Sequence, residues 1–84
     1  MNTIIQTDGF ELTSALNDHV KTKLKKLDRF NLTNLRCLMK PSGHDFEVEL
    51  LADGRFFKLT DADMYSAITK AVEKFSEGLS RSKD

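Results

Sequence analysis

The segment ELTSALNDHVKTKLKKLDRF, residues 11 to 30, decides the fold because it has the pattern of one amphipathic helix. Its apolar residues recur at intervals of four, four and three, which places them on one side of a helix. Thr13 stands just before them, where a hydroxyl can accept a backbone N–H of the first turn. Asn31 follows the segment and tolerates the left-handed conformation of a helix end. We therefore expect one helix over residues 11–30 with an apolar stripe of Leu16, Val20, Leu24 and Leu27.

The other faces of this helix carry many cations. Residues 19 to 29 hold five lysines and arginines against one acid, Asp28. At about 100° per residue Lys23 falls beside the apolar stripe, so its stem must lie along apolar surface while its ammonium reaches the rim. Lys23 shares this flank with His19 and Lys26. The remaining cations are expected on the outer side of the helix: Lys21, Lys25 and Arg29. Such a face is either simply solvated or a phosphate-binding surface.

The composition indicates one small globular domain. The 84 residues are 39% hydrophobic and 31% charged, which is typical of a folded, water-soluble chain. No apolar run approaches the roughly 20 residues of a membrane span, and the first residues lack the features of a secretory signal. The single cysteine, Cys37, excludes an internal disulfide and a cysteine-based zinc site. We expect a single domain over residues 1–84, located in the cytoplasm.

The formal net charge is zero, which by itself does not favour a nucleic-acid partner. The charges are unevenly spread, however, because residues 44–53 (HDFEVELLAD) hold four acids and no lysine or arginine. A local basic patch can bind phosphate whatever the total charge. The charge count therefore leaves RNA binding open.

Four further stretches have the pattern of strands: residues 2–7, 35–40, 45–50 and 55–59. A turn is expected at Pro41-Ser42-Gly43, and Asp53-Gly54 is a strong hairpin signal because both central residues of a type I′ turn need positive φ. A second helix is predicted from residue 63 to about 80. Its start is either the box formed by Thr60 to Asp63 or Asp63 alone. Its apolar stripe is made of Tyr65, Ile68, Val72, Phe75 and Leu79.

The order β-α-β-β-β-α predicts an α+β two-layer sandwich, a four-stranded sheet with both helices on one face. On strand 55–59, Phe57 and Leu59 should face the core while Phe56 and Lys58 face outwards. The outer sheet face is expected to mix apolar and charged residues: Ile4, Leu38, Leu51 and Phe56 among Arg36, Lys40, Lys58, Glu47 and Glu49. Contiguous apolar residues there would mark a self-association or partner surface.

No group of residues has the pattern of a catalytic or metal site. His19 and His44 have no second histidine or carboxylate at metal-ligand spacing, and Cys37 belongs to an alternating core pattern without an activating base. Asp61 and Asp63 are explained by helix capping, and there is no glycine-rich phosphate loop. We expect a non-enzymatic binding module without cofactor or metal.

The motifs, taken in order, resemble the family of short ribosome hibernation-promoting factors and ribosome-associated inhibitors, also called sigma-factor modulation proteins. They are ELTSAL with KLKKLDRF, then ADGRFFKLTD, then DADMYSAI with VEKF and LSRSK. The most specific is Asp63-Met64-Tyr65 followed by Ala67-Ile68, and the resemblance runs from residue 1 to about 83. It implies this same fold, similar to double-stranded-RNA-binding domains. It also implies a regulator that occupies the mRNA and tRNA channel of the small ribosomal subunit and inactivates idle ribosomes under stress.

The resemblance further implies which residues bind ribosomal RNA. The matching basic positions are Lys23 and Lys26 on the first helix and Lys74, Arg81 and Lys83 on the second. With their neighbours they are expected to form one basic two-helix face on RNA phosphates: Lys21, Lys23, Lys25, Lys26, Arg29, Lys70, Lys74, Arg81 and Lys83.

A second hypothesis places the functional surface on the outer sheet face. Glu77 stands where the family often has an arginine, and Glu73 and Glu77 can pair with the lysines and arginine of the second helix. With zero net charge, this pattern fits a divergent paralogue that acts as a protein-interaction module. Its expected contact surface, in a homodimer or with a partner, contains Ile4, Leu38 and Phe56.

Overall fold

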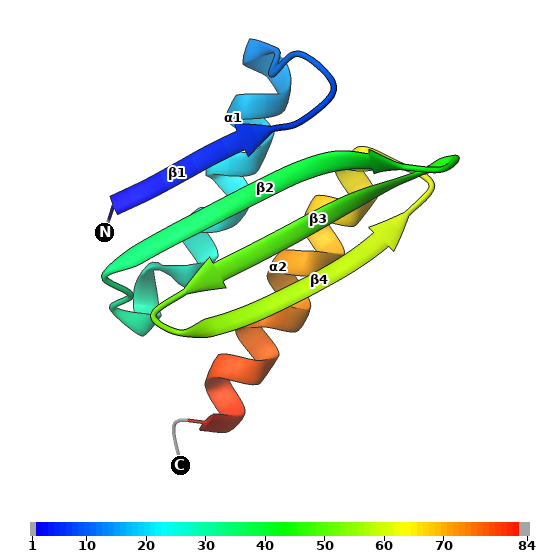
Figure 1. The fold of residues 1–84 in the computed structure, drawn as a ribbon. Coiled ribbons are helices and arrows are strands. Elements are labelled where there is room, and N and C mark those ends of the chain that lie inside the picture. The colour runs from blue at the N-terminus through cyan, green and yellow to red at the C-terminus, as the bar shows by residue number, and fades with distance from the viewer. Residues whose placement is uncertain (1, 83–84) are drawn as a thin grey trace.

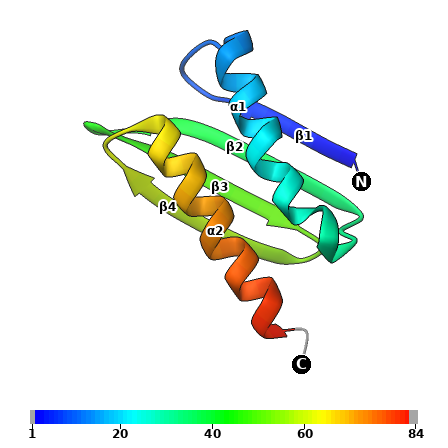
Figure 2. The same cartoon turned by 180° about the vertical axis from the view of Figure 1, so that it is seen from behind.

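In the computed structural model, which describes residues 2–82, four strands form one sheet and two helices cover one of its faces (Figures 1 and 2). The strands are β1 (Asn2–Thr7), β2 (Asn34–Ser42), β3 (Asp45–Ala52) and β4 (Arg55–Asp61), and they lie in the sheet in sequence order. The helices are α1 (Ser14–Leu24), continued by the 3-10 helix η1 (Lys25–Phe30), and α2 (Met64–Ser82). The predicted two-layer α+β sandwich is confirmed.

The connections follow from the direction of the strands. β1 is parallel to β2, and a parallel pair needs a crossover, which α1 and η1 supply. β2, β3 and β4 are antiparallel neighbours joined by tight turns. Asp53 (φ 49°) and Gly54 (φ 83°) both have positive φ, as the type I′ prediction requires.

The turn predicted at Pro41 lies two residues further on. β2 continues through Pro41 and Ser42, and the turn is formed by Gly43 and His44. The backbone nitrogen of Pro41 faces the β1 side of β2 and carries no hydrogen. Because β1 ends opposite Met39, it does not pair with β2 at Pro41, and no hydrogen bond between the two strands is lost there.

Both predicted capping residues of the first helix are confirmed, but the α-helix is shorter than expected and changes its geometry towards the end. Thr13 Oγ1 accepts a hydrogen bond from the Leu16 N–H at 3.2 Å, and Asn31 adopts the left-handed conformation at φ 55°. The α-helix starts only at Ser14 and ends at Leu24, and the last six residues of the predicted helix, Lys25–Phe30, form the 3-10 helix η1 instead. Apolar residues three apart, Leu24, Leu27 and Phe30, suit that geometry because a 3-10 helix aligns residues i and i+3.

The core lies between the helices and the inner face of the sheet. The predicted stripe of the first helix is buried. On α2 the stripe is correct except for Tyr65, which is 43% exposed because it lies about 100° from the buried Met64 at the margin of the helix–sheet contact. α2 is capped by Asp63, whose Oδ2 accepts the Ser66 N–H at 2.9 Å. The capping box from Thr60 is wrong, since Thr60 pairs with Glu47 inside β4.

The outer sheet face has the predicted residues. Phe56 and Lys58 are exposed, while Phe57 and Leu59 are half-buried against the core. Unexpectedly, Glu47 is only 8% exposed, because Lys40 at 3.1 Å and Lys58 at 3.8 Å enclose its carboxylate. The hydrogen bond from Lys40 lowers the pKa of the Glu47 carboxyl.

Candidate nucleic-acid interface

The predicted cations lie on the helix layer, where the order across the molecule is β4 edge, α2, α1 and β1 edge (Figure 2). The two helices run side by side in the same direction, since His19 in the middle of α1 meets Tyr65 at the start of α2, and Arg29, further along the chain in η1, reaches Ser76 and Ser80. Eight of the nine predicted residues fall within the described chain, and Lys83 lies outside it. They divide into three groups.

The first group, here called the central strip, consists of Lys23, Lys26 and Arg29 on the side of α1 and η1 that faces α2. Lys26 and Arg29 lie in η1, where 3-10 geometry aligns residues three apart with a rise of about 6 Å, and Lys23 lies three residues before Lys26 in the last turn of α1. Lys23 is half-buried, as expected for a stem that lies along apolar surface. Arg29 was expected on the outer side with Lys21 and Lys25. That prediction is wrong because it assumed 100° per residue, and the 3-10 turn rotates Arg29 into the row of Lys26.

Arg29 is held in place by contacts to both helices. Its Nη2 donates to Ser76 Oγ at 3.3 Å and Ser80 Oγ at 3.4 Å, and its guanidinium carbon lies 4.6 Å from the centre of the Phe30 ring. Both hydrogen bonds use Nη2, so Nη1 and Nε of this exposed side chain have no hydrogen-bond acceptor among the described residues. Arginine presents such donors in a rigid fork that matches phosphate oxygens. The central strip therefore ends in a pre-oriented anion-binding group.

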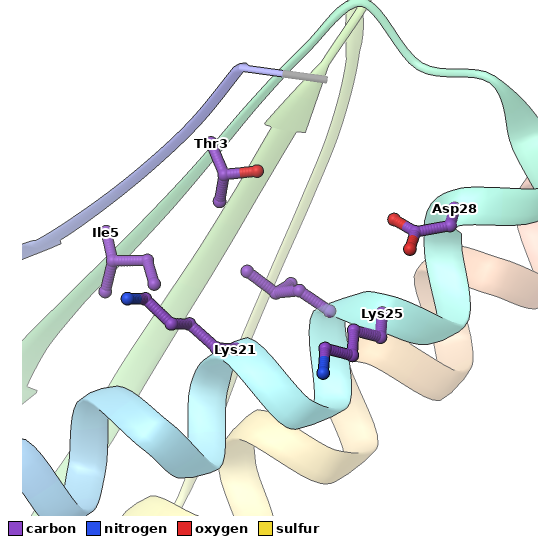
Figure 3. Close-up of a pocket in the computed structure, with 6 residues that line it drawn as sticks. Thr3, Ile5, Lys21, Lys25 and Asp28 are labelled. Carbon is purple, nitrogen blue, oxygen red and sulfur yellow. The ribbon is translucent and has the colours of Figure 1, made fainter.

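The second group, here called the β1 flank, consists of Lys21 and Lys25. Both line a groove of about 270 Å³ between α1 and β1, together with Thr3, Ile5 and Asp28 (Figure 3). In Figure 3 the Lys21 ammonium extends beside Ile5, whereas Lys25 and Asp28 follow along the helix. These two lysines are on the opposite side of α1 from the central strip.

The third group, here called the β4 flank, consists of Lys70, Lys74 and Arg81. Lys70 pairs with Asp61 at the end of β4 at 2.5 Å, rather than with Glu73. This hydrogen bond lowers the pKa of Asp61 and raises that of Lys70. Lys74 and Arg81 both pair with Glu77 at 3.7 Å, which confirms the neutralisation expected for this helix.

The sequence prediction of one continuous basic face across both helices stays a prediction, although acids engage its three described cations on α2. α2 directs Lys70 and Lys74 towards β4, where Lys70 pairs with Asp61 and Lys74 lines a small groove with Arg55 and Phe56. Towards α1 it presents Tyr65, Ser76 and Ser80 instead. The two serines were not identified from the sequence. Their spacing of four residues places them on one side of the helix at the margin of the apolar stripe, and it could have indicated a shared contact.

Among residues 2–82 no cluster of three potential metal ligands occurs. Cys37 is buried, and burial raises the pKa of its thiol from 9.0 to about 12, so the reactive thiolate is disfavoured. No helix within the described part of the chain has the length and apolarity needed to cross a membrane.

Comparison with known proteins agrees with the motif resemblance. A family model described as Sigma 54 modulation protein / S30EA ribosomal protein matches residues 3–84. Among solved structures, the N-terminal domain of Protein Y from Thermus thermophilus is similar with a TM-score of 0.79 and 28% identity, over 96% of this chain and 98% of that chain.

A ribosomal subunit interface protein from Coxiella burnetii shares the fold with a TM-score of 0.85 and 19% identity, over 99% of this chain and 98% of that chain. No curated protein sequence matches the chain. Because the family model covers nearly all of the sequence, this protein belongs to the Sigma 54 modulation protein / S30EA ribosomal protein family.

Proposed function

We propose that this protein is a non-enzymatic translation regulator. It binds the small ribosomal subunit in the channel for mRNA and tRNA and inactivates idle ribosomes under stress or in stationary phase. The family supports a ribosomal partner, as do the names of the two structural relatives, Protein Y and a ribosomal subunit interface protein. The observation that carries the proposal is the central strip, in which Lys26 and Arg29 are aligned along η1 after Lys23 in α1, and hydrogen bonds to α2 hold Arg29 in place.

The strip binds RNA phosphates, and the protein acts by occupying its site. Lys23 and Lys26 supply mobile ammonium groups, and Arg29 supplies a pre-oriented fork whose charge does not titrate. Contacts of this kind read the shape and charge of folded RNA rather than base sequence. Occupancy of the channel excludes mRNA and tRNA, so no chemical step is needed.

The two flanks contribute less. Lys70, Lys74 and Arg81 are engaged by Asp61 and Glu77, so RNA must displace these carboxylates before it gains their charges. Lys21 and Lys25 are separated from the strip by the width of α1. We assign the primary RNA contacts to the central strip and long-range attraction to the flanks and to Lys83.

Co-sedimentation with purified small subunits at low and moderate salt tests the proposal. The Lys23→Glu, Lys26→Glu double variant should lose pelleting, whereas Lys21→Glu, Lys25→Glu, with the same change in net charge, should retain most of it at moderate salt. Equal loss in both variants would show that total charge matters rather than the strip. No pelleting of the unmodified protein at low salt would refute ribosome binding.

The outer sheet face supports a second candidate function, a protein-interaction module. Ile4, Arg36, Leu51 and Phe56 lie opposite one another across the four strands, and Phe56 is 59% exposed. A row with three exposed apolar side chains is a surface that a partner or second copy can cover. Leu38, two residues after Arg36 on β2, lies on the same face and is half-buried. Under this candidate Phe56→Asp abolishes partner binding or dimerisation, and the Lys23, Lys26 reversal leaves it unchanged.

A further inference from the structure

We propose that the open edge of β1 is a docking site for an acidic, extended protein segment, which adds to the sheet as a fifth strand beside α1. The inference is independent of the ribosomal function proposed above. It rests on the β1 flank, which the RNA interface leaves largely unused.

β1 is an unguarded sheet edge. Within residues 2–82 it pairs only with β2, and its sequence NTIIQT contains no charged residue and no proline. Four of its six residues are exposed. Edge strands are usually protected by charges, prolines or bulges, because their free N–H and C=O groups invite another strand. The opposite edge, β4, has such protection in Arg55, Lys58 and the Lys70–Asp61 ion pair.

The backbone geometry identifies which groups are available. The N–H of Asn2 bonds the Thr33 carbonyl, and the N–H of Asp8 bonds the Met39 carbonyl, both on the β2 side. Because backbone groups alternate in direction along a strand, the even-numbered residues face β2. The odd-numbered residues Thr3, Ile5 and Thr7 direct their N–H and C=O groups to the open edge. A fifth strand would pair with these three residues.

The groove above this edge selects the charge of the incoming strand. Thr3 and Ile5 turn their side chains to the α1 side, where they share the groove with Lys21 and Lys25. Neither lysine has a carboxylate partner within ion-pair distance among the described residues. The Lys25 N–H bonds the Lys21 carbonyl, so the two residues are one full α-turn apart, about 6 Å along the helix. Alternate residues of a strand are spaced by about 6.7 Å. Acidic residues at positions i and i+2 of the added strand therefore match the two lysines.

The other side of the added strand meets a different surface. Ile4 is 47% exposed on the outer face of β1, so the residues between the acids would continue the row of Ile4, Leu51 and Phe56. The fitting segment alternates acidic and apolar residues. Asp28 at the end of the groove opposes an acidic ligand, and its neutralisation should strengthen binding.

Fluorescence anisotropy with a labelled VEVEVE peptide tests the site. The protein should bind it at least about tenfold more tightly than VVVEEE, which has the same charge without the alternation. Thr3→Pro removes one edge N–H without touching the bonds to β2 and should weaken binding about five- to tenfold, while Thr3→Val should not. Lys21→Glu, Lys25→Glu should abolish binding, Asp28→Asn should strengthen it, and Lys23→Glu, Lys26→Glu should change it little.

Hydrogen exchange keeps the proposal testable if Thr3→Pro disturbs folding. In the unmodified protein VEVEVE should slow exchange at the Thr3, Ile5 and Thr7 amides, whereas VKVKVK should not. Equal binding of VEVEVE and VVVEEE, or no added protection at these amides, would overturn the proposal. So would a concentration-dependent dimer whose odd-numbered β1 amides are already protected, because a second copy would then be the occupant.

Discussion

Arg29 allows a quantitative test of the RNA interface because the structure separates its charge from its orientation. Ser76→Ala with Ser80→Ala removes both hydrogen bonds that Nη2 donates and leaves the guanidinium and Phe30 in place. An arginine side chain that becomes free regains up to about 2 kcal/mol of rotamer entropy. The remaining stacking on Phe30 retains part of the order. We therefore expect affinity for the small subunit to fall by about 1 kcal/mol, roughly fivefold.

Removal of the charge should have a different signature. Each cation–phosphate contact contributes about 0.7 to 0.9 to the slope of log affinity against log salt, so the three cations of the strip predict a slope of about −2 to −3. Arg29→Gln should reduce its magnitude by about 0.7 to 0.9. The double serine variant should leave the slope unchanged, because it keeps all three charges.

The assay is a titration of fluorescently labelled protein with small subunits at a series of KCl concentrations. All variants should keep the unfolding temperature close to that of the unmodified protein, since the hydrogen bonds removed are long and exposed. The reasoning is refuted if Arg29→Gln weakens binding without changing the slope. It is equally refuted if the serine variant changes the slope as much as Arg29→Gln does, because orientation and charge would then not be separable.

Three further predictions concern groups outside the strip. Burial raises the pKa of the Cys37 thiol from 9.0 to about 12. The stability that the buried neutral thiol contributes is therefore complete below about pH 9 and is lost as pH rises towards 12. In urea titrations the free energy of unfolding should fall between pH 8 and 10 by about 1.4 kcal/mol more in the unmodified protein than in Cys37→Ala. The hydrogen bond from Lys70 holds the pKa of Asp61 below its ordinary value, a shift whose stabilisation is present above that value and lost as pH falls through the folded-state pKa. Lys70→Met should therefore raise the Asp61 pKa in an NMR titration and make unfolding less sensitive to acid, and an unchanged pKa would contradict the ion pair. Thr13→Ala should cost about 1 kcal/mol in the free energy of unfolding because the Leu16 N–H loses its cap, whereas Thr13→Ser should not.

Much of the fold was accessible from local pattern. The stripe through Leu16 and Leu27, the alternation in the strands and the Asp53-Gly54 turn each depend on residues close in sequence, and the structure confirms them. The change from α to 3-10 geometry at Lys25 was not predicted. Spacing by three and spacing by four occur together in any amphipathic helix, so the pattern alone does not show where a helix tightens.

The arrangement of the cations depended on long-range information. Sequence places Lys70 and Lys74 on the surface of α2 but does not say which margin of the helix faces the sheet edge and which faces α1. That choice follows from packing of Ala67, Ala71 and Phe75 on the sheet, and it brings Lys70 to Asp61. The position of Arg29 required both the 3-10 turn and the partner serines 47 and 51 residues away.

Competition with mRNA and tRNA is the most direct test of the proposed function. Labelled protein is titrated with empty small subunits and with subunits already loaded with mRNA and initiator tRNA, at the same salt concentration. Occupation of the channel predicts tight binding to empty subunits and little binding to loaded ones, with release of bound protein as mRNA and tRNA are added. Equal affinity for empty and loaded subunits would contradict it and place the binding surface elsewhere on the ribosome.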